Sequence, residues 1–129
     1  RVNCVVDYFG PSSFAGMSAS KEASEKGALF QFIGKSYADA PDLWAEASPL
    51  THVSSKSAPL LAIHGAADTL VPIRQSEILV EKLKNAGVEA ALHRVDGAPH
   101  GFHNSLATED AQRAWKAALE FLHRHLQPR

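Results

Sequence analysis

Three short apolar segments, separated by helical patterns, constrain the fold more than any other feature of this 129-residue chain. They span residues 2–9, 58–64 and 89–95, and a glycine lies within two residues of the end of each. Segments that are apolar on most of both faces are typical of parallel strands covered by helices on each side. Because strands and helices alternate along the chain, we expect right-handed crossovers and a three-layer α-β-α fold of the α/β class.

Two amphipathic helices are predicted, one over residues 73–86 and one that begins after Thr108 as its N-cap. Asn85 and Gly87 stand where the first helix needs a left-handed C-cap. The stripe expected to be buried on the first helix comprises Ser76, Leu79, Val80, Leu83 and Ala86. The corresponding face of the second comprises Ala111, Trp115, Ala118, Leu119 and Leu122.

Residues 10–47 form an excursion between the first two predicted strands. Its first part, residues 11–26, is rich in Ser, Ala, Gly and charged residues, which predicts a loop. Two short helices are expected after it, over 27–33 and 39–47, with Asp39 as the N-cap of the second. We therefore expect a single domain over 1–129 that contains this excursion.

The charge and cysteine content exclude several classes of protein. Thirteen Lys and Arg against fourteen Asp and Glu give a formal net charge of −1, so no basic field is available for nucleic acid or an anionic membrane. Cys4 is the only cysteine, which rules out an internal disulfide and favours a cytoplasmic location. No apolar run approaches the roughly 18 residues of a membrane span. We expect no membrane span, no metal and no cofactor.

The residues with chemical potential follow the second and third predicted strands. Asp68 lies four residues after the second strand, and His100 follows the third between two glycines. Since parallel strands present their carboxyl ends at one edge of the sheet, we expect these two side chains to come within hydrogen-bond reach. A carboxylate that accepts the Nδ1 proton of a histidine prepares Nε2 to act as a base toward a nucleophile.

The two loops also resemble a known family. His64-Gly-x-x-Asp68-x-x-Val71-Pro72 and Gly97-x-x-His100-Gly101-Phe102 are similar to the acid and histidine loops of α/β-hydrolase esterases and lipases. The resemblance is strongest to the prolyl-oligopeptidase-like and acetyl-xylan or feruloyl esterase branch, and it extends to residues 5–11 and 47–53. It implies the carboxyl-terminal half of an α/β-hydrolase fold, a lid-like role for 10–47, and a small-molecule ester substrate. By resemblance, Asp68 is the triad acid and His100 the triad base.

The family's Gly-x-Ser-x-Gly nucleophile motif and its oxyanion-hole loop are absent from these 129 residues. The nearest string, residues 16–20, lacks the final glycine, so Ser18 is interpreted as a solvated loop serine with a nucleophile as the alternative. The chain, which starts without Met, is therefore expected to be part of something longer and almost inactive alone.

The remaining candidates have simpler interpretations. His64 is expected to be structural or pocket-lining, and His103 an exposed loop residue. His123 and His125 lie about 200° apart on a helix, too far round to share a metal. Cys4 is expected to be an inert core thiol. Five apolar residues of the excursion are left between a lid or acyl pocket and ordinary packing, namely Phe14, Phe30, Phe32, Leu43 and Trp44.

Two functions are compatible with these patterns. The chain supplies the acid and histidine of a serine ester hydrolase, or it is a non-catalytic self-associating or binding domain derived from one. In both cases the first strand lacks a neighbour on one side, so we expect a homo-oligomer that contacts through residues 2–9. The alternative is that residues 11–26 fold back over this strand and keep the chain monomeric.

Overall fold

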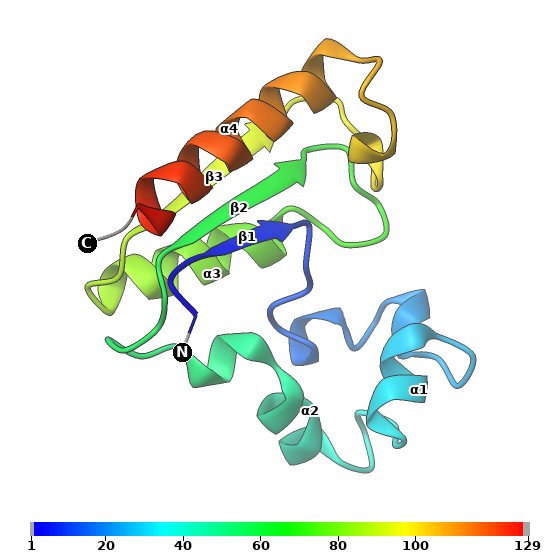
Figure 1. The fold of residues 1–129 in the computed structure, drawn as a ribbon. Coiled ribbons are helices and arrows are strands. Elements are labelled where there is room, and N and C mark those ends of the chain that lie inside the picture. The colour runs from blue at the N-terminus through cyan, green and yellow to red at the C-terminus, as the bar shows by residue number, and fades with distance from the viewer. Residues whose placement is uncertain (1, 128–129) are drawn as a thin grey trace.

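The computed structural model describes residues 2–127 and contains one parallel sheet of three strands in the order β1-β2-β3 (Figure 1). The strands are β1 (Val5–Tyr8), β2 (Leu60–Gly65) and β3 (Ala90–Val95). Val5 is in register with Leu60, and Leu60 with Ala90. The three predicted strands are confirmed, although the first is shorter than residues 2–9 because regular pairing with β2 begins at Val5.

Helices cover the two faces of the sheet, as Figure 1 shows, with α3 (Arg74–Asn85) on one side and α4 (Glu109–Leu126) on the other. Every residue of β2 is buried, and its side chains alternate between the two layers. Leu60 and Ala62 pack in the α3 layer, whereas Leu61 and Ile63 pack in the α4 layer. The predicted three-layer α-β-α arrangement is confirmed.

The face of α4 that meets the sheet differs from the predicted one. Its buried residues are Ala111, Ala114, Ala118 and Phe121. Trp115 and Leu119 are about half exposed, at 50% and 48%. Alanines and Phe121 fill the contact with the sheet, and Trp115 and Leu119 lie on a neighbouring stripe of the helix. The predicted caps are confirmed: Thr108 Oγ1 accepts a hydrogen bond from Ala111 N at 3.2 Å, and Gly87 after α3 has φ of 76°.

The excursion, visible as the lower lobe in Figure 1, packs around a small core beneath the end of β1 that also includes Val71. It contains α1 (Ala28–Ile33) and α2 (Pro41–Ala47). The predicted loop over 11–26 includes two 3-10 turns, Ala15–Met17 and Lys21–Ala23, and a third, Pro49–His52, follows α2. The predicted N-cap Asp39 is wrong: Ala40 precedes α2, because the Asp39 carboxylate accepts from Ser36 Oγ instead.

The β1 strand pairs with β2 on one side only, among the residues described here. Residues 11–26 make no backbone hydrogen bond to residues 2–9 within that part of the chain. Val6 and Tyr8 are half-buried because they pack against the α4 layer, whereas Val2 is 62% exposed. The described residues therefore leave one edge of β1 unpaired, but Val6 and Tyr8 are more buried than the sequence predicts. No helix within residues 2–127 has the length and hydropathy to cross a membrane.

Candidate active site

The loop after β2 holds the Asp68 carboxylate in a fixed position. Asp68 Oδ1 accepts hydrogen bonds from the backbone N–H groups of Leu70 and Val71, both at 2.9 Å. The side chain is fully buried. Two backbone donors compensate for part of the lost hydration of a buried carboxylate and leave Oδ2 available for a further partner.

That partner is His100, on the loop after β3. His100 Nδ1 lies 2.7 Å from Asp68 Oδ2, so the prediction that these residues come within hydrogen-bond reach is confirmed. An ionised carboxylate has no proton to give, so Nδ1 donates and Nε2 carries the lone pair. The imidazole is one-third exposed. The arrangement presents a basic nitrogen to solvent, with its tautomer set by a buried acid.

The two loops can meet because Gly65 ends β2. Ala67 N donates to Ala98 O at 3.0 Å, and Ala66 N donates to Val95 O at 2.8 Å. A β-carbon at position 65 would collide with the Ala98 carbonyl oxygen, so only glycine permits this approach. The backbone contact brings the Asp68 loop and the His100 loop into register at the carboxyl edge of the sheet.

His64 supports the Asp68 loop through hydrogen bonds, which agrees with the structural role predicted for it from the sequence. Its ring is completely buried. Nε2 lies 2.7 Å from Val71 O, and Nδ1 lies 2.7 Å from Ser76 Oγ on α3. Since a carbonyl only accepts, Nε2 donates and Nδ1 accepts from the hydroxyl. Nε2 is also 3.4 Å from Asp68 Oδ2. Both ring nitrogens are engaged, and the sequence alone did not identify Ser76 as the partner.

Phe9, which follows β1, is a part of the site that sequence reasoning missed. Its φ is 45°, and no other non-glycine residue within 2–127 has a positive φ. Its ring centroid lies 4.4 Å from that of His100. Backbone strain of this kind persists where surrounding contacts hold it and is common at active sites. The only sequence signal was the Gly10-Pro11 turn that follows.

His103 is not the exposed loop residue that the sequence predicts. Its ring centroid lies 5.1 Å from that of Tyr8 and 4.9 Å from that of Phe9, and the residue is half-buried. Its Nδ1 is buried and, among the described atoms, without a hydrogen-bond partner. The short 3-10 turn Phe102–Asn104 folds this ring back onto the aromatic end of β1. His103 therefore contacts His100's aromatic neighbour but not the Asp68–His100 pair.

Asp7, on β1, adds a carboxylate near this edge of the sheet. Burial raises the pKa of Asp7, while the Gly10 N–H bond and the nearby His64 lower it by less. Gly10 N donates to Asp7 Oδ1 at 3.1 Å, which closes the turn after β1. Burial also raises the pKa of Tyr8. The turn that carries Phe9 is thus stabilised by a carboxylate that is itself costly to bury.

A cavity of about 310 Å³ opens beside His100. Its walls are mainly apolar, and the excursion contributes Met17, Ala28 and Leu29 to them. The five apolar residues left open by the sequence do not line it. Phe14 and Trp44 are buried in the core of the excursion, which favours the packing interpretation for them, whereas Phe32 is 72% and Leu43 38% exposed. Phe30 is half-buried.

No serine lines this cavity within residues 2–127. Ser18 ends the turn Ala15–Met17, where its N–H bonds to Ala15 O at 3.2 Å, and it makes no hydrogen bond to His100 in the described chain. The structure therefore does not bring Ser18 to the Asp68–His100 pair.

The remaining candidates lie away from the site. His125 Nε2 is 3.4 Å from Glu89 Oε1, and His123 Nε2 is 2.6 Å from Gln127 Nε2. No group of three potential metal ligands occurs in the part of the chain that the structure describes. Cys4 is half-buried and packs with the α4 layer.

Solved structures share this architecture. A truncated carbohydrate esterase from gut microbiota superposes with a TM-score of 0.82 at 32% identity, over 97% of this chain and 43% of that chain. A puromycin-hydrolyzing peptidase of Mycobacterium tuberculosis gives 0.83 at 27% identity, over 98% of this chain and 19% of that one. The parallel sheet, its two helical layers and these likenesses define an α/β-hydrolase fold, which confirms the resemblance noted from the sequence.

The sequence matches agree with this class. Esterase LipQ of Mycobacterium tuberculosis is 32% identical over 96 residues, which are 73% of this chain and 23% of LipQ. A non-reducing polyketide synthase of Aspergillus calidoustus, ausA, is 31% identical over 122 residues, 90% of this chain and 5% of the synthase. The chain is carboxylic ester hydrolase-like, and it spans under half the length of these proteins.

The BD-FAE family model matches residues 1–83, and the chain belongs to the BD-FAE family. This match includes Asp68, whereas His100 lies beyond it.

Proposed function

We propose that this chain supplies the acid and the base of a serine hydrolase that acts on carboxylic esters. The observation that carries the proposal is the 2.7 Å bond between Asp68 Oδ2 and His100 Nδ1. Asp68 is buried, and two backbone N–H groups fix its Oδ1, so its Oδ2 is preorganised to accept from His100. His100 is the partly exposed member of the pair and the one that substrate can reach.

In the proposed reaction, His100 Nε2 takes the proton of a serine hydroxyl as its oxygen attacks the ester carbonyl. Asp68 stabilises the imidazolium that forms. The tetrahedral intermediate expels the alcohol, which receives the proton from Nε2, and water then hydrolyses the acyl-enzyme by the same two steps. The serine and the oxyanion donors are proposed to come from residues outside the 129, either in the same polypeptide or on another chain.

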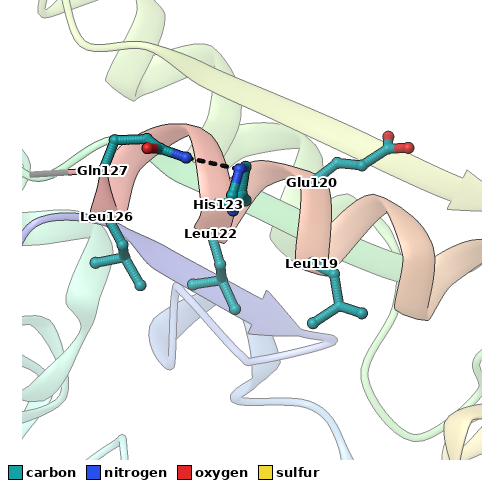
Figure 2. A pocket seen from close by; sticks show the side chains of 6 residues that line it. All are labelled: Leu119, Glu120, Leu122, His123, Leu126 and Gln127. Carbon is teal, nitrogen blue, oxygen red and sulfur yellow. Dashed lines mark hydrogen bonds between the residues drawn. The ribbon is translucent and has the colours of Figure 1, made fainter.

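A second candidate is a self-associating domain that has kept Asp68 and His100 without using them. The observation that favours it is exposed apolar surface on α4, the helix that packs against β1. In Figure 2, Leu119, Leu122 and Leu126 extend from one side of α4, and Glu120 points away from them. Leu119 and Leu126 are 48% and 54% exposed.

The deciding experiment uses the complete reading frame that encodes this chain. If it encodes a Gly-x-Ser-x-Gly motif, the purified protein is assayed for ester hydrolysis and for labelling by a fluorophosphonate. His100→Ala should lower kcat by about 10³-fold or more, because the base is removed. His103→Ala, which removes an imidazole outside the pair, should lower it by no more than about tenfold.

Equal losses in the two variants would show that the wrong histidine has been assigned. Unchanged activity in His100→Ala, or a frame without a nucleophile and without activity, would favour the self-associating domain. The 129-residue chain alone should not react with the fluorophosphonate. Labelling of that chain would place the nucleophile within it and overturn the proposal that the serine comes from outside the 129 residues.

A further inference from the structure

The cavity beside His100 has an uneven distribution of charge. Tyr8, Phe9 and Pro11 line it from the end of β1, and Leu70 and Val71 line it from the Asp68 loop. Besides His100, the one titratable carboxylate or amine in its wall, within the described residues, is Glu22. An apolar group that enters beside His100 therefore meets a single carboxylate and no Lys or Arg.

Glu22 is held in place by the excursion. It lies in the turn Lys21–Ala23, and its Oε2 accepts a hydrogen bond from Ala28 N at 3.1 Å, where α1 begins. The residue is half-buried. A single neutral N–H donor satisfies one oxygen and leaves the charge uncompensated. No Lys, Arg or His side chain forms an ion pair with Glu22 in the described part of the chain.

A carboxylate in an apolar wall discriminates between ligands by charge. It attracts an ammonium group, accepts a hydrogen bond from a hydroxyl and repels another carboxylate. Glu22 therefore favours a cationic ligand group and disfavours an anionic one.

We propose that Glu22 makes this cavity selective for ester substrates whose apolar arm ends in an ammonium group. This inference rests on the proposed function only in that it places the reacting ester at His100. Charge selection by the cavity is a property of binding and does not need the nucleophile, so it can be tested on the 129-residue chain.

The test uses three probes with a similar skeleton and different ends: 3-phenylpropylammonium, 3-phenylpropan-1-ol and 3-phenylpropanoate. Binding is followed by NMR through the methyl groups of Met17, Leu29 and Val71. The ammonium probe should bind about tenfold more tightly than the carboxylate probe, with the alcohol between them.

Two variants separate Glu22 from the general charge of the protein. Glu22→Gln keeps a carbonyl oxygen for Ala28 N–H and should lower the affinity for the ammonium probe by about three- to tenfold, with little effect on the alcohol. Glu25→Gln removes the same charge from an exposed neighbour that does not line the cavity, and it should leave all three affinities unchanged. His100 is unchanged in the wild-type protein and in both variants, so its contribution to the affinities cancels when they are compared.

The proposal is overturned if wild-type protein binds the ammonium and carboxylate probes equally, or if Glu22→Gln and Glu25→Gln change the ammonium affinity to the same extent. Absence of binding by all three probes would also overturn it. If Glu22→Gln does not fold, Glu22→Met takes its place, because the wild-type order reports the whole charge around the cavity and not that of Glu22 alone. None of these results depends on hydrolysis, so they are distinguishable from failure of His100 as the base.

Discussion

Asp68 shows how a carboxylate can be fully buried and still keep polar partners on both oxygens. An isolated charge in a protein interior is destabilised by several kcal/mol unless polar partners replace its hydration. Asp68 has two backbone N–H donors on Oδ1 and the His100 imidazole on Oδ2. Loss of any one partner would leave the others to hold a poorly solvated charge, so the geometry of the loop and the chemistry of the pair are coupled.

Asp7 is the opposite case, because its burial is only partly compensated. Its pKa is raised by burial, so the folded state binds the proton more tightly than the unfolded state. The stability of the fold therefore falls as pH rises from the ordinary aspartate value, about 3.9, through the raised pKa, and stays reduced above it. Asp7→Asn keeps an oxygen for Gly10 N–H and removes the charge, so it should raise the Tm at pH 7, with the gain disappearing near pH 3.

Thermal unfolding of wild-type protein and variant across this pH range measures the effect. Asp96→Asn is the control, because that side chain is 88% exposed and should change the Tm little at any pH. A lower Tm for Asp7→Asn at neutral pH would mean that His64 and the Gly10 N–H outweigh the cost of burial.

At the scale of elements, the first turn of α3 joins the sheet to the excursion. Ser76 bonds to the buried His64 under the Asp68 loop. The adjacent Gln75 is 5% exposed, and its Oε1 accepts from Ser12 N at 3.0 Å and from Ser13 N at 2.7 Å. The first turn of α3 thus holds both the Asp68 loop and the segment that leads from β1 into the cavity wall.

Removal of the Gln75 amide should loosen the excursion rather than the sheet. Gln75→Ala leaves two backbone N–H groups without their acceptor, which should cost about 1–3 kcal/mol of unfolding free energy. Amide exchange at Ser12 and Ser13 should accelerate more than exchange in β2. The matched control is Gln112→Ala, because Gln112 donates to Leu106 O at an exposed site. Equal acceleration throughout the chain would show that the excursion does not open separately.

At the scale of the whole molecule, the exposed surface includes the free edge of β1 and an apolar stripe of α4, the helix that packs against β1. The stripe comprises Trp115, Leu119, Leu122 and Leu126. Three of these are about half exposed, from 48% to 54%. An unpaired strand edge beside apolar side chains readily accepts another strand and another apolar face.

We propose that a second copy of this chain occupies that surface in the isolated protein, with the contact including residues 2–9. Sedimentation at micromolar concentration should show a dimer or larger species. Leu119→Lys places a charge in the stripe and should shift the population toward monomer. Phe32→Lys alters an equally apolar residue that is 72% exposed on the excursion, and it should leave the assembly unchanged. A wild-type species of 13.9 kDa would contradict the proposal.

The sequence by itself determined the features that depend on local pattern. The apolar runs predicted three strands, and punctuation by Gly65 and Gly97 located the loops that follow two of them. Because parallel strands end at one edge, that was enough to predict that Asp68 and His100 meet. The caps Thr108 and Gly87 were equally predictable, since capping depends on residues within one turn.

Only the tertiary structure decided the features that depend on partners distant in the chain. The buried face of α4 runs through Ala114, Ala118 and Phe121, which pack with Leu61 and Ile63, and a helical stripe alone cannot reveal this choice. His103 was drawn onto Tyr8 and Phe9 by a turn with no marked sequence signal. Glu22 lies in the wall beside His100 because the excursion packs around a core that it shares with Val71 of the Asp68 loop. Long-range packing sets these contacts, and periodicity records only which residues are apolar, not which neighbour they will meet.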